Sequence, residues 1–159
     1  MKKICVITGG RPDYGLLREA MFQIRESNQL RLQMIATGMH LSPEFGNTKD
    51  QILEDGFTID REVENIISSD TRSAVVKSIG LGMIGFADAF RTLSPDCVLV
   101  LGDRSEIFAG VVAAMVTGVP VGHIHGGEIT EGSIDENIRH AITKMAHLHF
   151  VAAEEYRAR

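Results

Sequence analysis

Two histidines, four carboxylates and a glycine pair are crowded into residues 123–136, HIHGGEITEGSIDE. The stretch follows an apolar run, Val119 to Gly122, and precedes a helical pattern that starts near Ile134. A connection between a strand and a helix needs polar residues, but it does not need this many titratable ones. Histidine and carboxylate side chains are the usual groups of general acid–base chemistry, and glycine lets backbone approach a ligand closely because it has no Cβ. The stretch therefore predicts the floor of an active site.

The two histidines of this stretch have different expected roles. His123 can be a satisfied core histidine, whereas His125 points to the opposite side if the strand persists, which makes it the better cleft residue. A zinc site formed by His123, His125 and Glu128 is conceivable, but loop ligands at this spacing are nonspecific. We therefore predict no metal ion and no cofactor.

Ser133 and Glu136 have the spacing of a capping box at the start of the following helix. This pairing favours Asp135 over Glu136 as the carboxylate free for chemistry. Arg139 and His140 lie one turn into the helix, where they belong either to the surface or to the site.

Two further polar turns come directly after expected strands. Residues 8–15, TGGRPDYG, lack the G-x-G-x-x-G spacing of a dinucleotide fold, and no acidic residue ends the next strand to hold a ribose. A helix N-terminus beside Arg11 still favours an anion such as phosphate, although a tight turn with a surface arginine is the simpler interpretation. Asp103 reaches the cleft or only caps a helix together with Glu106, three residues on.

Our candidate residues come from these turns. The candidate catalytic residues are Asp103, Asp135, His125, Glu128 and Glu136. The candidate substrate-binding residues are Arg11, Asp13, Gly10, Arg104, Gly127 and Arg139.

Strands alternate with helices along the chain. The apolar patterns predict strands at residues 3–8, 30–37, 57–63, 96–101, 119–124 and 148–152, and helices at residues 16–26, 49–55, 70–91, 105–117, 134–146 and from 154 onward. Such alternation indicates parallel pairing, hence an α/β fold with a Rossmann-like doubly wound parallel sheet. Ligands in such sheets bind beyond the carboxyl ends of the strands, where the polar turns lie. Glycines 80, 82 and 85 in the longest helix predict close packing there.

Composition narrows the function classes. The chain has 159 residues, 44% of them hydrophobic, and a formal net charge of −5, which argues against a nucleic-acid or anionic-membrane partner. Cys5 and Cys97 fall in expected strands and are predicted to be free buried thiols. No signal-peptide core and no run of about 18 apolar residues is present, so we expect a cytoplasmic protein without a membrane span.

With these residues in place, the chain resembles the hydrolysing UDP-N-acetylglucosamine 2-epimerases. The resemblance rests on residues 10–15 (GRPDYG), 102–104 (GDR), 123–128 (HIHGGE) and 134–144 (IDENIRHAITK), and it spans essentially the whole chain. The last two motifs are specific together, whereas the first alone would not be.

The resemblance implies a two-domain GT-B fold with the site between two Rossmann-like halves. Residues 1–159 would be the N-terminal domain, the C-terminal domain would be absent, and a helix that starts only at Glu154 agrees with a longer protein. The implied reaction releases UDP by anti elimination to 2-acetamidoglucal, which water converts to N-acetylmannosamine for sialic acid synthesis. Asp103 and Asp135 fall on the family's catalytic carboxylates and Arg11 on the basic residue near the diphosphate.

This chain has His125 where several members of that family have glutamate, and Glu128 lies three residues on, so which of the two takes that role is open. The implied partner is a UDP-sugar, and we expect a homo-oligomer, a dimer or tetramer, of the full-length protein. The alternatives are a GT-B glycosyltransferase and a non-catalytic sugar-nucleotide-binding domain.

Overall fold

The computed structural model describes residues 1–69, 71–129 and 134–158. The strands are β1 (Lys2–Thr8), β2 (Leu30–Thr37), β3 (Arg61–Val63), β4 (Cys97–Leu101), β5 (Val121–Ile124) and β6 (Leu148–Phe150). The α-helices are α1 (Arg11–Glu26), α2 (Lys49–Glu54), α3 (Arg72–Leu93), α4 (Ser105–Val116), α5 (Ile134–Met145) and α6 (Glu154–Arg157). Two short 3-10 turns, η1 (Gly38–Leu41) and η2 (Pro43–Phe45), follow β2.

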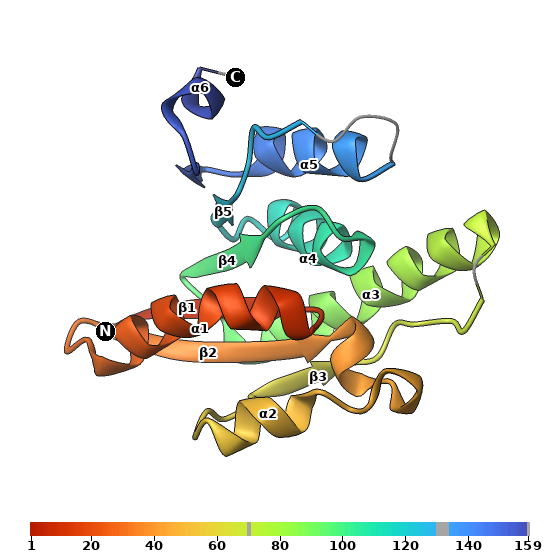
Figure 1. The fold of residues 1–159 in the computed structure, drawn as a ribbon. Coiled ribbons are helices and arrows are strands. Elements are labelled where there is room, and N and C mark those ends of the chain that lie inside the picture. Colours follow the sequence, from red (N-terminus) through yellow and green to blue (C-terminus); the bar gives the residue numbers. More distant parts are fainter. Residues whose placement is uncertain (70, 130–133, 159) are drawn as a thin grey trace.

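The strands form one parallel sheet in the order β3-β2-β1-β4-β5-β6. This is the doubly wound order in which the chain leaves β1 in one direction and later returns to β4 on its other side. Figure 1 shows the resulting arrangement, with β1, β2 and β4 in the middle of the molecule. The Rossmann-like parallel sheet expected from the sequence is confirmed.

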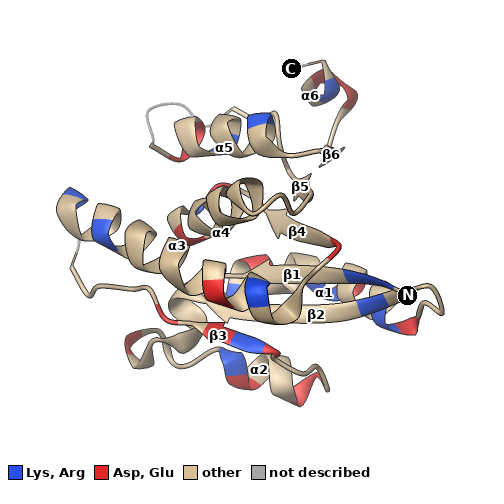
Figure 2. Ribbon diagram, turned by 180° about the vertical axis from the view of Figure 1, so that it is seen from behind, with Lys and Arg blue, Asp and Glu red and all other residues tan. Residues whose placement is uncertain are grey.

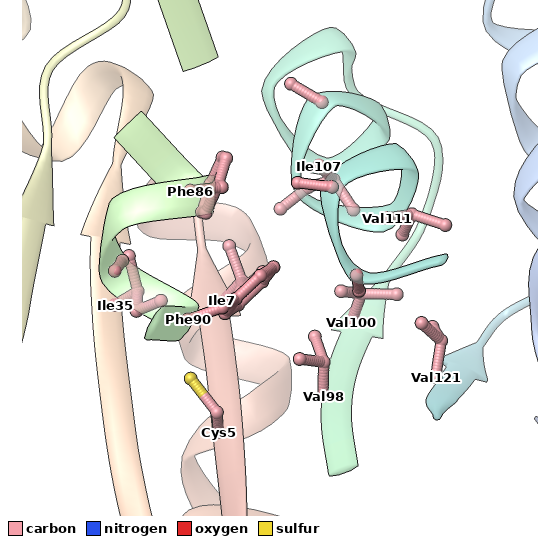
Figure 3. Close-up of a cluster of buried hydrophobic side chains, with 14 of the residues drawn as sticks. Cys5, Ile7, Ile35, Phe86, Phe90, Val98, Val100, Ile107, Val111 and Val121 are labelled. Atoms are coloured by element: carbon pink, nitrogen blue, oxygen red, sulfur yellow. The ribbon is translucent and has the colours of Figure 1, made fainter. Parts of the chain in front are cut away.

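Alternating side chains of the central strands supply two hydrophobic cores. Cys5 and Ile7 of β1 point to the face covered by α3, α4 and α5, whereas Val6 between them points to the face covered by α1 and α2. Figure 3 shows the first core, where Phe86 and Phe90 of α3 lie among side chains from β1, β2 and β4. Both faces of the sheet are therefore buried, and polar groups gather at its ends.

α3 packs closely on its neighbours through glycine. A Cβ on Gly82 would lie 2.9 Å from the Cβ of Ala109, and a Cβ on Gly85 would lie 2.7 Å from Val63 Cγ1. The prediction of close packing is confirmed at these two positions. It is wrong at Gly80, where an added Cβ would meet nothing within 4 Å.

Two element boundaries differ from the sequence prediction by four or more residues, and the others differ by two residues or fewer. α1 begins at Arg11, five residues earlier than expected, because Pro12 fits the first turn of a helix rather than breaking it. β3 is confined to Arg61–Val63, whereas Phe57, expected in this strand, donates its backbone N–H to Ile52 O and buries its ring as part of a loop.

α3 has the length and hydropathy of a membrane-spanning helix, and 28% of its most apolar window is buried. The argument from apolar runs therefore does not exclude a span at this helix. Its buried side packs against α4 and the sheet, as the core helix of an α/β domain does.

Charged residues of both signs are interspersed over the helices and strands. Figure 2 shows Lys and Arg beside Asp and Glu on α2 and β3, where Lys49 pairs with Glu62 at 3.0 Å. Both cysteines are free; Cys5 is buried as expected, but Cys97 is only half-buried.

Candidate active site

The polar turns meet at the carboxyl edge of the sheet. The turns after β1 and β4 flank the point where the direction of the chain reverses, and the turn after β5 lies next to that of β4. Gly102 directly follows β4 with φ 78°, a left-handed conformation that favours glycine, and its N–H donates to Ile124 O of β5 at 3.0 Å. The segments that carry Asp103 and His125 are thus fastened together by backbone.

Asp103 is held by an arginine from α5. Arg139 donates from Nε to Asp103 Oδ2 at 2.9 Å, and its Nη2 donates to the same oxygen. The side chains are only 11% and 18% exposed, so the ion pair lies largely out of water. The N-cap of α4 is Arg104, not Asp103, and no side chain caps the helix. Asp103 is therefore directed into the site, and the alternative that it only caps α4 is wrong.

Glu128 extends this ion pair towards His125. Arg139 Nη1 donates to Glu128 Oε2 at 3.0 Å, and Glu128 Oε1 lies 2.6 Å from His125 Nδ1. The hydrogen bond from His125, followed by the charges of His125 and Arg139, lowers the pKa of Glu128. Four side chains, Asp103, Arg139, Glu128 and His125, thus form one connected row.

His125 itself has φ 62°, a left-handed conformation that costs a residue with a Cβ about 1–2 kcal/mol. β5 has already ended at Ile124, so the alternation argument for the direction of His125 does not apply to it. A sharp backbone turn, rather than a continuing strand, directs the imidazole towards Glu128.

Asp135 lies across a cleft from Asp103. Both residues line one cleft of about 410 Å³ together with Arg104, Ser105, Glu106 and side chains of α3 and α5. Glu136, the next residue, contacts His140 Nε2 through Oε1 at 2.9 Å. The predicted cap, Ser133, lies outside the described residues. The structure thus brings together Asp103 and Asp135, the two carboxylates that the sequence analysis favoured.

Asp13 is buried rather than exposed to a ligand. It is 6% exposed, its Oδ1 accepts from Arg104 Nε at 3.2 Å, and its Oδ2 is a buried oxygen without a hydrogen-bond partner. Burial raises the pKa of Asp13, although the Arg104 guanidinium opposes this shift. Gly10 is the N-cap of α1, and Arg11, the first residue of that helix, is exposed.

The glycine pair after β5 serves packing within the chain. A Cβ on Gly126 would lie 2.8 Å from His123 Nδ1, and a Cβ on Gly127 would lie 2.6 Å from Tyr156 O. Gly127 also has φ 79°. The idea that these glycines only give a ligand access to the backbone is incomplete, because neighbouring parts of this chain already occupy the space.

His123 is a satisfied core histidine, as predicted. It is fully buried, its Nε2 lies 2.7 Å from Gly102 O, and its Nδ1 lies 3.3 Å from Thr143 Oγ1. With both ring nitrogens engaged, His123 is unsuited to share a zinc ion with His125 and Glu128. No cluster of three metal-binding side chains occurs in the described parts of the chain.

Two buried polar residues near the site were missed by the sequence analysis. Glu106 lies beneath the turns after β1 and β2, where a Cβ on Gly9 would come within 2.6 Å of its Oε1, and burial raises its pKa. His40 bridges Thr8 Oγ1 at 2.9 Å and Thr48 Oγ1 at 2.7 Å, and burial lowers its pKa to about 4. The glycines at the ends of β1 and β2 were the available signal, because they mark space for another side chain.

A parallel sheet of this order, with acidic and basic side chains at its carboxyl edge, defines a Rossmann-like domain of the kind that binds nucleotides. The family model for UDP-N-acetylglucosamine 2-epimerase matches residues 23–159. The chain belongs to this family, so the membership expected from the sequence motifs is confirmed.

Relatives are similar over nearly the whole chain. The chain is 42% identical over 158 residues to the GDP/UDP-N,N'-diacetylbacillosamine 2-epimerase (hydrolyzing) of Campylobacter jejuni, covering 99% of this chain and 41% of that protein. It is 42% identical over 159 residues to the UDP-N,N'-diacetylbacillosamine 2-epimerase (hydrolyzing) of Legionella pneumophila, covering 100% and 42%. A UDP-N-acetylglucosamine 2-epimerase of Neisseria meningitidis is 34% identical over 155 residues, covering 98% and 40%.

Solved structures of the family share the fold. The crystal structure of UDP-GlcNAc 2-epimerase from Neisseria meningitidis bound to UDP-GlcNAc superposes with a TM-score of 0.83 at 25% identity, covering 99% of this chain and 42% of that one. The expected GT-B type of Rossmann-like sheet is confirmed by this likeness. The chain spans about two fifths of the length of the relatives that it matches.

Proposed function

We propose that residues 1–159 are the N-terminal domain of a hydrolysing UDP-sugar 2-epimerase whose second domain completes the site. The observation that carries this proposal is the 42% identity, over 99–100% of this chain, to two relatives named as hydrolysing 2-epimerases. The cleft lined by Asp103 and Asp135 supports it, because both carboxylates lie beyond the carboxyl ends of neighbouring strands.

The proposed reaction has two steps. A base removes the proton on carbon 2, the C2–H electron pair forms the C1=C2 double bond, and UDP leaves carbon 1 with the electrons of the C1–O bond. Water then adds across the double bond: its oxygen bonds to carbon 1 and loses one proton to the site, and carbon 2 receives a proton on the face opposite to the one from which the first proton left. Positive charge develops on the ring as UDP departs, and preorganised carboxylates such as Asp103 and Asp135 would stabilise it. Arg11, exposed at the start of α1, is the proposed contact for the diphosphate.

The sugar of the substrate is the finer part of this proposal. The family resemblance implies UDP-N-acetylglucosamine, although the sequence alone does not distinguish it from a diacetamido relative. The two relatives at 42% identity are named for N,N'-diacetylbacillosamine, and the N. meningitidis UDP-N-acetylglucosamine 2-epimerase is at 34%. This gradient favours the diacetamido sugar, and we keep UDP-N-acetylglucosamine as the second candidate. In either case the leaving group is a nucleoside diphosphate and carbon 2 carries an acetamido group.

Proton NMR of the full-length protein in D2O tests the proposal. We expect release of UDP and a free 2-epimerised sugar with deuterium at carbon 2, and parallel reactions with the two UDP-sugars assign the substrate. Transfer of the sugar to an acceptor without epimerisation would indicate a glycosyltransferase. Binding without turnover of either sugar would indicate a regulatory domain.

Two further experiments test the proposed site and domain organisation, one with a substitution at Asp103 and one with the 159-residue chain alone. Asp103→Asn keeps the size of the side chain and removes its charge, so it should abolish turnover while leaving UDP affinity within about threefold. The 159-residue chain alone should be inactive, because it would lack half of the proposed crevice. Turnover by this chain alone would contradict the proposed domain organisation.

The expected setting of the enzyme is also a proposal. We propose a cytoplasmic homo-oligomer, a dimer or tetramer, that needs no metal ion or cofactor. Light scattering of the full-length protein at micromolar concentration measures its oligomeric state, and assay after extensive treatment with EDTA tests the independence from metals. A monomer would contradict the proposed oligomer. Activity that is lost with EDTA and restored by a divalent ion would contradict the proposed independence from metal ions.

A further inference from the structure

Glu128 lies between Arg139 and His125 in the row of four side chains and is poorly suited to take up a proton. Its Oε1 lies 2.6 Å from His125 Nδ1, and its Oε2 accepts from Arg139 Nη1 at 3.0 Å. Hydrogen bonds and neighbouring positive charge favour the ionised form, so they lower the pKa of Glu128. A carboxylate stabilised in this way on both oxygens is a weak base, which leaves Glu128 the task of orienting its neighbours.

His125 has the opposite properties. Because Glu128 is an anionic acceptor at Nδ1, the neutral imidazole carries its proton on Nδ1 and its lone pair on Nε2. Among the residues that the structure describes, none hydrogen bonds to Nε2, and 39% of the side chain is exposed. The φ of 62° at His125 is a backbone outlier of the kind found where a side chain must be aimed.

Arg139 completes the arrangement through contacts to two carboxylates of this chain. Its Nε and Nη2 donate to Asp103, and its Nη1 donates to Glu128. Only 11% of its side chain is exposed, so the guanidinium is committed to two carboxylates within the chain. A substrate phosphate could use this arginine only by displacing one of them, which would leave a largely buried carboxylate unpaired.

We propose that Nε2 of His125 is the base that removes the proton on carbon 2, and that Glu128 and Arg139 are positioning residues for His125 and Asp103. This inference rests on the proposed 2-epimerase function and deepens it. In the elimination, Nε2 takes the proton, the C2–H pair becomes the double bond, and UDP leaves with the C1–O pair. The imidazolium that forms is stabilised by Glu128, which remains ionised. In this proposal His125, and not Glu128, performs the proton transfer.

The first test is chemical rescue in the full-length protein. His125→Gly suits the left-handed backbone at this position and leaves a space for a free base. We expect kcat to fall by about 10²–10⁴-fold, the usual contribution of a general base, and added imidazole to restore at least about tenfold. His149→Ala in β6 is the matched control, because this exposed histidine lies outside the row, and it should neither lose activity nor respond to imidazole.

The second test separates positioning from substrate binding. Glu128→Gln removes the anion beside His125, so the acidic limb of the kcat profile should move to lower pH. Arg139→Met removes the positive charge that faces Glu128 and Asp103, so the same limb should move to higher pH. Both variants should lower kcat at least about tenfold while changing KM less than about threefold, and Arg139→Lys should recover part of the loss.

The outcomes distinguish this inference from the function on which it rests. If the wild-type protein turns over neither UDP-sugar, the proposed function falls and this inference falls with it. If the wild type is active but His125→Gly keeps more than a third of its kcat, or imidazole restores nothing to a folded variant, only the assignment of His125 is overturned. A raised KM with unchanged kcat in Arg139→Lys would make Arg139 a substrate-binding residue. If His125→Gly does not fold, the same kcat measurements on His125→Gln decide whether His125 is the base.

Discussion

The glycines of α3 give a prediction in which the same substitution, glycine to alanine, stabilises the protein at one position but not at another two residues away. Gly80→Ala places a methyl group where nothing lies within 4 Å, so the helix gains the difference in propensity between the two residues. That difference is about 1 kcal/mol in favour of alanine. Gly82→Ala gains the same amount but brings its Cβ to 2.9 Å from Ala109 Cβ and 3.1 Å from Asn65 Nδ2.

The packing at Gly82 determines the size of its effect. Both neighbours are firmly held, since Ala109 is part of α4 and Asn65 Oδ1 accepts from Thr37 Oγ1 and from Gly38 N–H. Overpacking of a closed contact costs about 1–3 kcal/mol. After the gain in helix propensity, Gly82→Ala should be neutral to destabilising by about 2 kcal/mol, whereas Gly80→Ala should stabilise by about 1 kcal/mol.

Urea unfolding of the 159-residue chain, followed by circular dichroism at 222 nm, measures both variants against the parent. The midpoint should rise for Gly80→Ala and stay or fall for Gly82→Ala, with unchanged m-values, because neither change alters the surface exposed on unfolding. A midpoint that rises equally in both variants would refute the close approach of α3 to α4. A fall for Gly80→Ala would refute the open position of that residue.

Three further predictions concern buried titratable groups. Burial lowers the pKa of His40 to about 4, below its ordinary value near 6.5. The free energy of unfolding should therefore be constant above pH 6.5 and fall between pH 6.5 and 4, by up to about 3 kcal/mol. In urea titrations over this pH range, His40→Gln should lose less of its free energy of unfolding than the parent. Burial raises the pKa of Glu106, so its ionised form opposes folding. Glu106→Gln should therefore be more stable than the parent at pH 7, with a smaller gain in stability at pH 4. An equal gain at the two pH values would show that the charge of Glu106 is not the cause. Cys5 is buried, and burial raises the pKa of its thiol, so Cys5 should react with a thiol reagent only when the protein is unfolded in urea. If the native protein is labelled faster at Cys5 than at the half-buried Cys97, the core described for β1 is contradicted.

The order of elements could be predicted from the sequence because apolar runs and turn residues alternate regularly. The two largest errors of boundary, at the starts of α1 and β3, have local causes. Pro12 and Gly15 interrupt the helical pattern of α1, although a proline in the first turn does no harm, and Phe57 is buried from a loop that resembles a strand in composition. A hydrophobic pattern in the sequence indicates which side chains are buried. It does not indicate whether the buried residue lies in a strand, a helix or a loop.

The candidate site was less predictable than the fold. The sequence motifs indicated Asp103 and Asp135, which line one cleft. They did not reveal that Asp13 pairs with Arg104, or that Arg139 joins Asp103 to Glu128, since these pairs lie 91, 36 and 11 residues apart in the sequence. Spacing along the chain defines neighbours within a helix or strand, whereas these ion pairs depend on the packing of α1 against β1 and β2 and of α5 against α4 and β5.

The position of β1 in the middle of the sheet also governs how this chain must assemble. β1 is synthesised before the other five strands of this sheet, yet one of its edges pairs with β4, and the N–H of Lys3 donates to the carboxylate of Asp96 across 93 residues of chain. At about 5–20 residues per second of synthesis, that edge waits roughly 5–20 seconds for its partner strand. The side chains of Cys5 and Ile7 lie in the core that α3, α4 and α5 complete, so this strand order leaves apolar surface of β1 uncovered until those later helices are made.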